Sequence, residues 1–80
     1  MKAKLIYNLD ELDDKTSHLR AIKSLDLTLC LWDLDQDLRA KIKYAPDDMS
    51  EDTYKAYEDV RTTLHQLMSK YSLNFDDILI

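Results

Sequence analysis

The sequence has no glycine, one proline and one cysteine among its 80 residues. Without glycine, the chain cannot build the glycine-rich loops that cradle phosphate groups. A single cysteine, Cys30, cannot form a disulfide within the chain and lies among leucines, where it predicts a small buried side chain of low reactivity. With 45% hydrophobic and 34% charged residues, this scarcity of turn formers predicts one all-α domain of helices joined by short turns.

Positive charge is outnumbered, because 11 lysines and arginines stand against 16 aspartates and glutamates, which gives a net charge of -5 and a sequence pI of about 4.8. We therefore expect no direct binding to nucleic acid or to a membrane, and a host protein with a basic surface as the favoured partner. An alternative is that the carboxylates only keep a small oligomer soluble. Four aspartates break up the longest apolar segment, so the sequence predicts no membrane span and a cytoplasmic protein: Asp26, Asp33, Asp35 and Asp37.

The segment from Leu25 to Arg39 holds the only tryptophan and cysteine and the densest run of leucines. Around it, apolar residues recur every three or four positions along two opposite sides of a helix. We call one set the first stripe: Leu19, Ile22, Leu25, Leu29 and Trp32. The other is the second stripe, the candidate oligomer interface: Leu27, Leu31, Leu34, Leu38 and Ile42. Because two apolar sides need two partners, we expect one partner from this chain and the other from a second copy. The alternative is a strand, since Leu25 to Leu31 also alternate with period two.

The predicted fold is an antiparallel helical hairpin, with a long central helix, a C-terminal helix and a short extended N-terminal arm, assembled into an oligomer. Pro46 ends the central helix, Ser50 caps the C-terminal helix, and Asn74 closes it in a left-handed turn. The tail is apolar and is expected to dock on the hairpin or on another subunit. The expected divisions are an arm at 1–9, a first helical region at 10–45, a second helix at 50–73 and the tail at 74–80.

Candidate sites follow from charge. Asp33, Asp35 and Asp37 form an acidic row that is expected to contact a basic partner. Arg39, Lys43 and Tyr44 are the candidate nucleotide-binding residues, because two cations one turn apart can hold a phosphate and a tyrosine can stack on a base. Asp33 and Asp37 with His65 do not reach the ligand density typical of helical metal sites. No catalytic spacing involves Cys30 or the two histidines, so we expect neither an enzyme nor a cofactor nor a metal.

Two segments carry a resemblance: Leu31-Trp-Asp-Leu-Asp-Gln-Asp-Leu-Arg-Ala-Lys-Ile-Lys-Tyr44 and Ser50-Glu-Asp-Thr-Tyr-Lys-Ala-Tyr-Glu-Asp-Val-Arg61, followed by Leu64-His65. They resemble a family of small proteins encoded by phages and prophages of Gram-positive hosts, which share the Leu-Trp-Asp-Leu-Asp-Gln core. The resemblance implies a non-enzymatic accessory protein that antagonises a host factor, as an anti-CRISPR-like inhibitor does. The alternatives are a homo-oligomeric sponge for a nucleotide immune signal and a structural or assembly factor.

Overall fold

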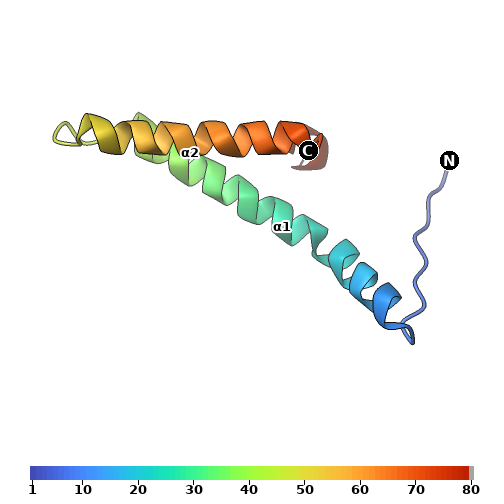
Figure 1. Ribbon diagram of the computed structural model, residues 1–80. Coiled ribbons are helices and arrows are strands. Elements are labelled where there is room, and N and C mark those ends of the chain that lie inside the picture. The colour runs from blue at the N-terminus through green and yellow to red at the C-terminus, as the bar shows by residue number, and fades with distance from the viewer. Residues whose placement is uncertain (80) are drawn as a thin grey trace.

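The computed structural model describes residues 1–79, in which the chain forms α1 (Leu12–Lys43), α2 (Glu51–Lys70) and α3 (Phe75–Leu79) (Figure 1). The prediction of an all-α fold, with a long helix packed against a second helix, is confirmed. The strand alternative is wrong, because every residue from Leu25 to Leu34 is helical. The molecule is elongated, with extents of 56 × 30 × 19 Å. No helix within residues 1–79 has both the length and the apolar character needed to cross a bilayer.

α1 runs without a break through the polar segment at Thr16 and Ser17. The Thr16 hydroxyl donates to the Leu12 carbonyl, 3.1 Å away, and so points back along the helix without interrupting it. The helix begins after Glu11, whose side chain makes no capping bond. Instead, the backbone amide of Asn8 donates a hydrogen bond to the Asp14 carboxylate at 2.8 Å. This bond connects the preceding chain to the first turn of α1. Residues 1–8 contain neither helix nor strand.

α2 has well-defined caps at both ends. The Ser50 hydroxyl accepts a hydrogen bond from the Thr53 amide, as the sequence predicts. At the other end, Ser72 adopts a left-handed backbone with φ of 56°. The Leu73 amide then donates to Met68 O, and the Ser72 amide to Ser69 O, which is the Schellman arrangement.

The prediction that Asn74 closes α2 is therefore wrong. The side-chain oxygen of Asn74 instead accepts a hydrogen bond from the Asp76 amide at the start of α3. Asn74 is two residues beyond the left-handed position, and an Asx side chain bonds readily to the amide two residues ahead. Ser72 adopts the left-handed backbone because the Schellman hydrogen bonds form at this position. The chain has no glycine that could occupy it instead.

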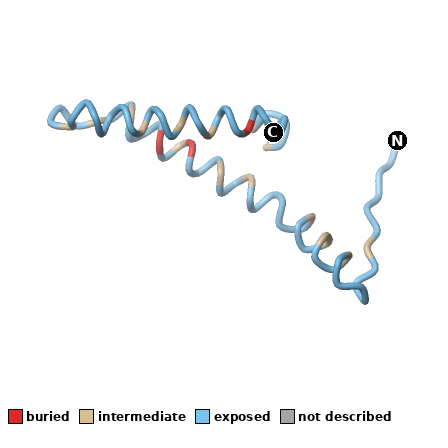
Figure 2. The backbone as a smooth tube through the Cα atoms, viewed as in Figure 1, coloured by how far each residue is buried: buried red, intermediate tan, exposed pale blue. Residues whose placement is uncertain are grey.

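The packed part of the molecule lies where α2 crosses the C-terminal half of α1. In residues 1–79 the buried hydrophobic side chains are Leu38 and Met68 (Figure 2). The two helices diverge from the Pro46 turn, so that the N-terminal half of α1 extends away from α2 (Figure 1). The tail, as α3, packs on α1, where the Phe75 ring meets the Trp32 ring edge-on at 5.1 Å.

This packing covers a different part of each stripe and leaves the rest exposed. Leu38 is buried and Ile42 is half-buried in the hairpin, so the C-terminal end of the second stripe is covered within a single chain. Leu27 and Leu34, on the same stripe, remain exposed. Cys30, between the two stripes, is also exposed, so the prediction of a buried cysteine is wrong. α3 lies over the C-terminal end of the first stripe, where its residues line a pocket with Leu29 and Trp32.

Candidate functional site

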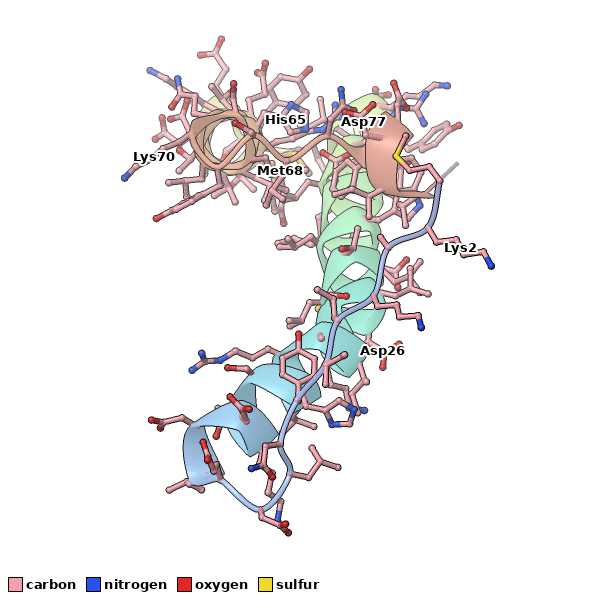
Figure 3. All side chains as sticks on the ribbon, turned by 90° about the vertical axis from the view of Figure 1, so that its right-hand side faces the viewer. Lys2, Asp26, His65, Met68, Lys70 and Asp77 are labelled. Carbon is pink, nitrogen blue, oxygen red and sulfur yellow. The ribbon has the colours of Figure 1, made fainter. Side chains whose placement is uncertain are left out.

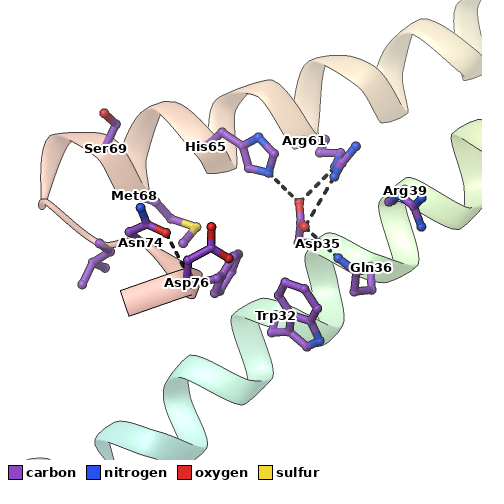
Figure 4. Close-up of a pocket in the computed structure, with 12 residues that line it drawn as sticks. Trp32, Asp35, Gln36, Arg39, Arg61, His65, Met68, Ser69, Asn74 and Asp76 are labelled. Atoms are coloured by element: carbon purple, nitrogen blue, oxygen red, sulfur yellow. Dashed lines mark hydrogen bonds and ion pairs between the residues drawn. The ribbon is translucent and has the colours of Figure 1, made fainter. Parts of the chain in front are cut away.

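Asp35 is a buried carboxylate at the centre of the α1–α2 contact, and it is 3% exposed. Its Oδ1 accepts a hydrogen bond from Arg61 Nε at 3.0 Å and lies 2.6 Å from His65 Nε2 (Figure 4). Because an ionised carboxylate can only accept, the proton of this second bond resides on His65 Nε2. Gln36 Nε2 donates to the other oxygen at 3.1 Å. The polar atoms of the buried carboxylate are therefore satisfied by both helices.

Burial and pairing act in opposite directions on Asp35. Desolvation favours the neutral acid and by itself raises the pKa of the carboxyl group. The hydrogen bonds from Arg61 and His65, together with the electrostatic attraction of these two side chains, outweigh the desolvation. They hold the pKa of Asp35 below its ordinary value of 3.8. The carboxylate is therefore ionised at neutral pH and acts as the electrostatic link between α1 and α2.

A solvent-open cavity of about 640 Å³ lies beside this link. Its walls combine cationic, aromatic and polar groups from all three helices: Trp32, Asp35, Gln36, Arg39, Arg61, His65, Met68, Ser69, Leu73, Asn74, Phe75 and Asp76 (Figure 4). Two guanidinium groups and two aromatic rings can contact a phosphate and a planar ring, respectively. Asp35 and Asp76 oppose this, because they place negative charge in the same cavity.

The predicted nucleotide-binding residues are split by the structure. Arg39 lines the cavity, whereas Lys43 and Tyr44 are not among its lining residues. Lys43 Nζ lies 5.4 Å from the centre of the Tyr44 ring, in a cation–π contact at the end of α1. Arg61, which spacing did not single out, supplies the second cation of the cavity.

The predicted acidic row is also split. Asp35 points into the hairpin, so its carboxylate is not presented to a partner. Asp33 and Asp37 are exposed, and Asp37 pairs with Lys41 at 2.6 Å. His65 does not join Asp33 and Asp37 but bonds to Asp35. No cluster of three or more potential metal-binding side chains occurs in residues 1–79.

A second concave surface lies on α2, away from the hairpin contact. We call it the acidic groove, lined by Glu51, Asp52, Tyr54, Lys55, Glu58, Asp59 and Thr62. Side chains radiate from α2 in all directions when it is viewed end-on, with Met68 toward the rest of the molecule and Lys70 pointing outward (Figure 3). The groove carries four carboxylates against one lysine, so it is the part of α2 best suited to a cationic partner.

Two of these features had a partial signal in the sequence. Arg61 and His65 are four residues apart and adjoin the apolar side of α2, which places both at the edge of a helix contact. Their partner is not evident from spacing, because Asp33, Asp35 and Asp37 look alike until the rotation of α1 is known. Comparison of the chain with protein-family models, with characterised proteins and with solved structures returns no match.

Proposed function

We propose that this protein is a non-enzymatic, phage-type accessory protein that binds and antagonises a host factor, acting as an anti-CRISPR-like inhibitor. The acidic groove is the observation that carries the proposal. Its four carboxylates stand on a single rigid helix, so their spacing does not depend on a mobile loop. The proposed target is a nucleic-acid-handling defence protein, whose basic groove the carboxylates occupy in place of phosphates.

Charge supports the same proposal at longer range. The net charge of -5 favours approach to a cationic surface and opposes approach to nucleic acid itself. Asp33 and Asp37 add exposed carboxylates on α1. The electrostatic part of the binding is therefore expected to weaken as salt shortens the Debye length from about 10 Å at 0.1 M to about 3 Å at 1 M.

The test is expression of the chain in a Gram-positive host that carries an RNA-guided defence nuclease, followed by infection with a phage that the nuclease targets. We expect plaque numbers to rise toward those of a host without the nuclease. The double variant Glu58→Gln/Asp59→Asn removes two charges from the middle of the acidic groove and is expected to reduce this rescue.

A matched control removes the same charge elsewhere. Asp10→Asn/Asp13→Asn removes two charges just before and within the first turn of α1, and is expected to leave the rescue unchanged. Binding to the purified nuclease should then be measured in low and high salt for all three proteins. Rescue that does not depend on the groove, or binding that is unaffected by salt, contradicts the electrostatic mechanism. No rescue with any such nuclease contradicts the function.

The cavity beside Asp35 favours a second candidate, a homo-oligomeric sponge for a nucleotide immune signal. Arg39 and Arg61 supply the cations for a phosphate, and Trp32 and Phe75 supply rings for a base. Thermal unfolding in the presence of cyclic nucleotides tests this candidate, since a ligand at a hundred times its Kd stabilises the folded state by about 2.7 kcal/mol. Arg39→Gln is the matched variant, because Arg39 has no part in the Asp35 link. Unchanged melting temperatures across the nucleotide panel exclude the candidate.

A further inference from the structure

The chain exposes far more surface than a self-contained protein of its mass. A folded monomer of 9.4 kDa exposes about 5,000 Å² by the usual scaling of area with mass, whereas this chain exposes 7059 Å². Its radius of gyration is 17.8 Å, against about 12 Å for a compact chain of the same length. Residues 1–8 account for part of the excess, because they lie outside any helix. The rest belongs to α1, whose N-terminal half has no neighbouring helix (Figure 1).

The uncovered part of α1 includes most of the first stripe. Leu19, Ile22 and Leu25 are 53%, 59% and 54% exposed, and Leu29 is 42% exposed. Their spacing puts them on one side of the helix, opposite the side that contacts α2 farther along. A helical segment of this length has little stability in water without an apolar contact. The N-terminal half of α1 therefore requires a partner to remain folded.

The size of the excess exposed surface indicates which kind of partner could cover it. The excess is about 2,000 Å² per chain, of which residues 1–8 account for part, and obligate homodimers bury about 2,000–5,000 Å² summed over both chains. Within residues 1–79, Leu38 and Met68 are the buried apolar side chains, which is a small core for a chain that must fold alone. A partner needed for folding itself must be present whenever the chain is made, and a second copy meets that condition. A row of apolar side chains is also self-complementary, as a two-fold interface requires.

We propose that α1 pairs with α1 of a second copy through the exposed residues of the first stripe, forming an obligate homodimer. The two helices run antiparallel. α3 sits on the Trp32 end of the stripe in each copy, so a parallel pair would bring two α3 helices together at one level. The antiparallel pair keeps the two α3 helices at opposite ends of the interface, and Ile22 of one copy faces Leu25 of the other. This interface differs from the second stripe, whose C-terminal end is already covered by α2.

The chain offers a closely matched pair of variants for the test. Leu25 and Leu27 are two positions apart in α1, are 54% and 61% exposed, and point to opposite sides of the helix. Leu25→Glu and Leu27→Glu make the same chemical change, and both should be analysed by sedimentation equilibrium, with helix content followed by circular dichroism. We expect the wild type and Leu27→Glu to have twice the monomer mass at micromolar concentration. Leu25→Glu should raise the Kd about a thousandfold, because two apolar contacts are lost in a symmetric dimer.

Loss of folding in Leu25→Glu has its own control. Leu25→Met keeps the apolar contact and should keep the dimer. In addition, the melting temperature of the wild type should rise with protein concentration, whereas that of a monomer would not. A monomeric wild type, or a Leu27→Glu variant that dissociates while Leu25→Glu stays dimeric, overturns the proposal. Neither result bears on the acidic groove, which lies on a different helix.

Discussion

Asp35 Oδ1 lies 3.0 Å from Arg61 Nε and so joins the two long helices at the most deeply buried polar position in residues 1–79. The two partners differ in exposure, because the Asp35 side chain is 5% exposed and the Arg61 side chain is 29% exposed. Removing the carboxylate therefore leaves a guanidinium that water can reach. The loss of folding free energy on removing Asp35 should therefore be smaller than the loss on breaking a pair in which both ions are buried.

The first prediction concerns this link. Asp35→Ala is expected to lower the free energy of unfolding by about 2 kcal/mol, because it removes charge-assisted hydrogen bonds from a buried position. Urea unfolding at one fixed protein concentration measures the change. Asp37→Ala is the matched control, since Asp37 is on the same helix and its bond to Lys41 is exposed. Equal destabilisation by both substitutions would show that burial of Asp35 has no energetic consequence.

The second prediction concerns acid. Asp35 has a folded pKa below its unfolded value of 3.8, so folding favours the ionised form. Its contribution to stability is fully present above pH 3.8 and is lost as the pH falls through the folded pKa. The stability difference between the wild type and Asp35→Asn should therefore be constant near neutral pH and shrink below about pH 4.

The measurement is denaturant unfolding of both proteins at several pH values from neutral to strongly acidic. Arg61 and His65 both face the carboxylate, so the series is repeated in a His65→Gln background to isolate the part due to Arg61. A difference that grows toward low pH would have the opposite sign to the predicted linkage and would contradict a lowered pKa.

The third prediction concerns Ser72, which has φ of 56° in the Schellman turn. A residue with a Cβ pays roughly 1 kcal/mol for left-handed backbone that glycine adopts freely. Ser72→Gly should therefore stabilise the protein by up to about 1 kcal/mol. Ser69→Gly, three residues earlier in the last turn of α2, should destabilise it by up to about 0.5 kcal/mol, because glycine is a poorer helix former than serine. Thermal melts of the two variants should shift in opposite directions, and a fall in melting temperature for both would contradict the left-handed assignment.

The sequence was sufficient to predict the two long helices, α1 and α2, because their signals are local, but it predicted residues 74–80 as an apolar tail and not as the helix α3. Apolar residues at helical spacing, Ser50 before an acidic turn and Pro46 after a basic one each act within a few residues. The closure at Ser72 was not predictable in the same way, since the residue preferences for a left-handed turn favoured Asn74. Local preference was outweighed there by the backbone bonds of Leu73 and Ser72 to the last turn of α2.

The candidate site was less predictable, because it depends on how α1 is rotated against α2. Asp33, Asp35 and Asp37 are equivalent by composition, yet only Asp35 falls on the side that α2 covers. The apolar stripes have the same ambiguity. Both are regular, and the sequence does not state which one meets α2. That choice depends on the divergence of the helices and on the docking of α3, which are properties of the whole fold.

The last prediction uses Trp32, the single tryptophan of the chain, as a probe of α3. The Phe75 ring meets the Trp32 ring at 5.1 Å and an interplanar angle of 80°, an edge-to-face contact. Phe75→Ala removes this ring and should release α3 from α1, at a cost of about 2 kcal/mol for a half-buried aromatic side chain. Because Trp32 then becomes more exposed to water, its fluorescence emission should shift to longer wavelength.

Tyr71→Ala is the control for this substitution. Tyr71 is also aromatic and lies just after α2, but this residue is 66% exposed and its ring makes no contact with the Trp32 ring. Its removal should leave the emission of Trp32 unchanged. If Phe75→Ala also leaves the emission unchanged, α3 is not held on α1 by this contact. The Trp32 end of the first stripe would then be open, and the stripe would be uncovered along its whole length.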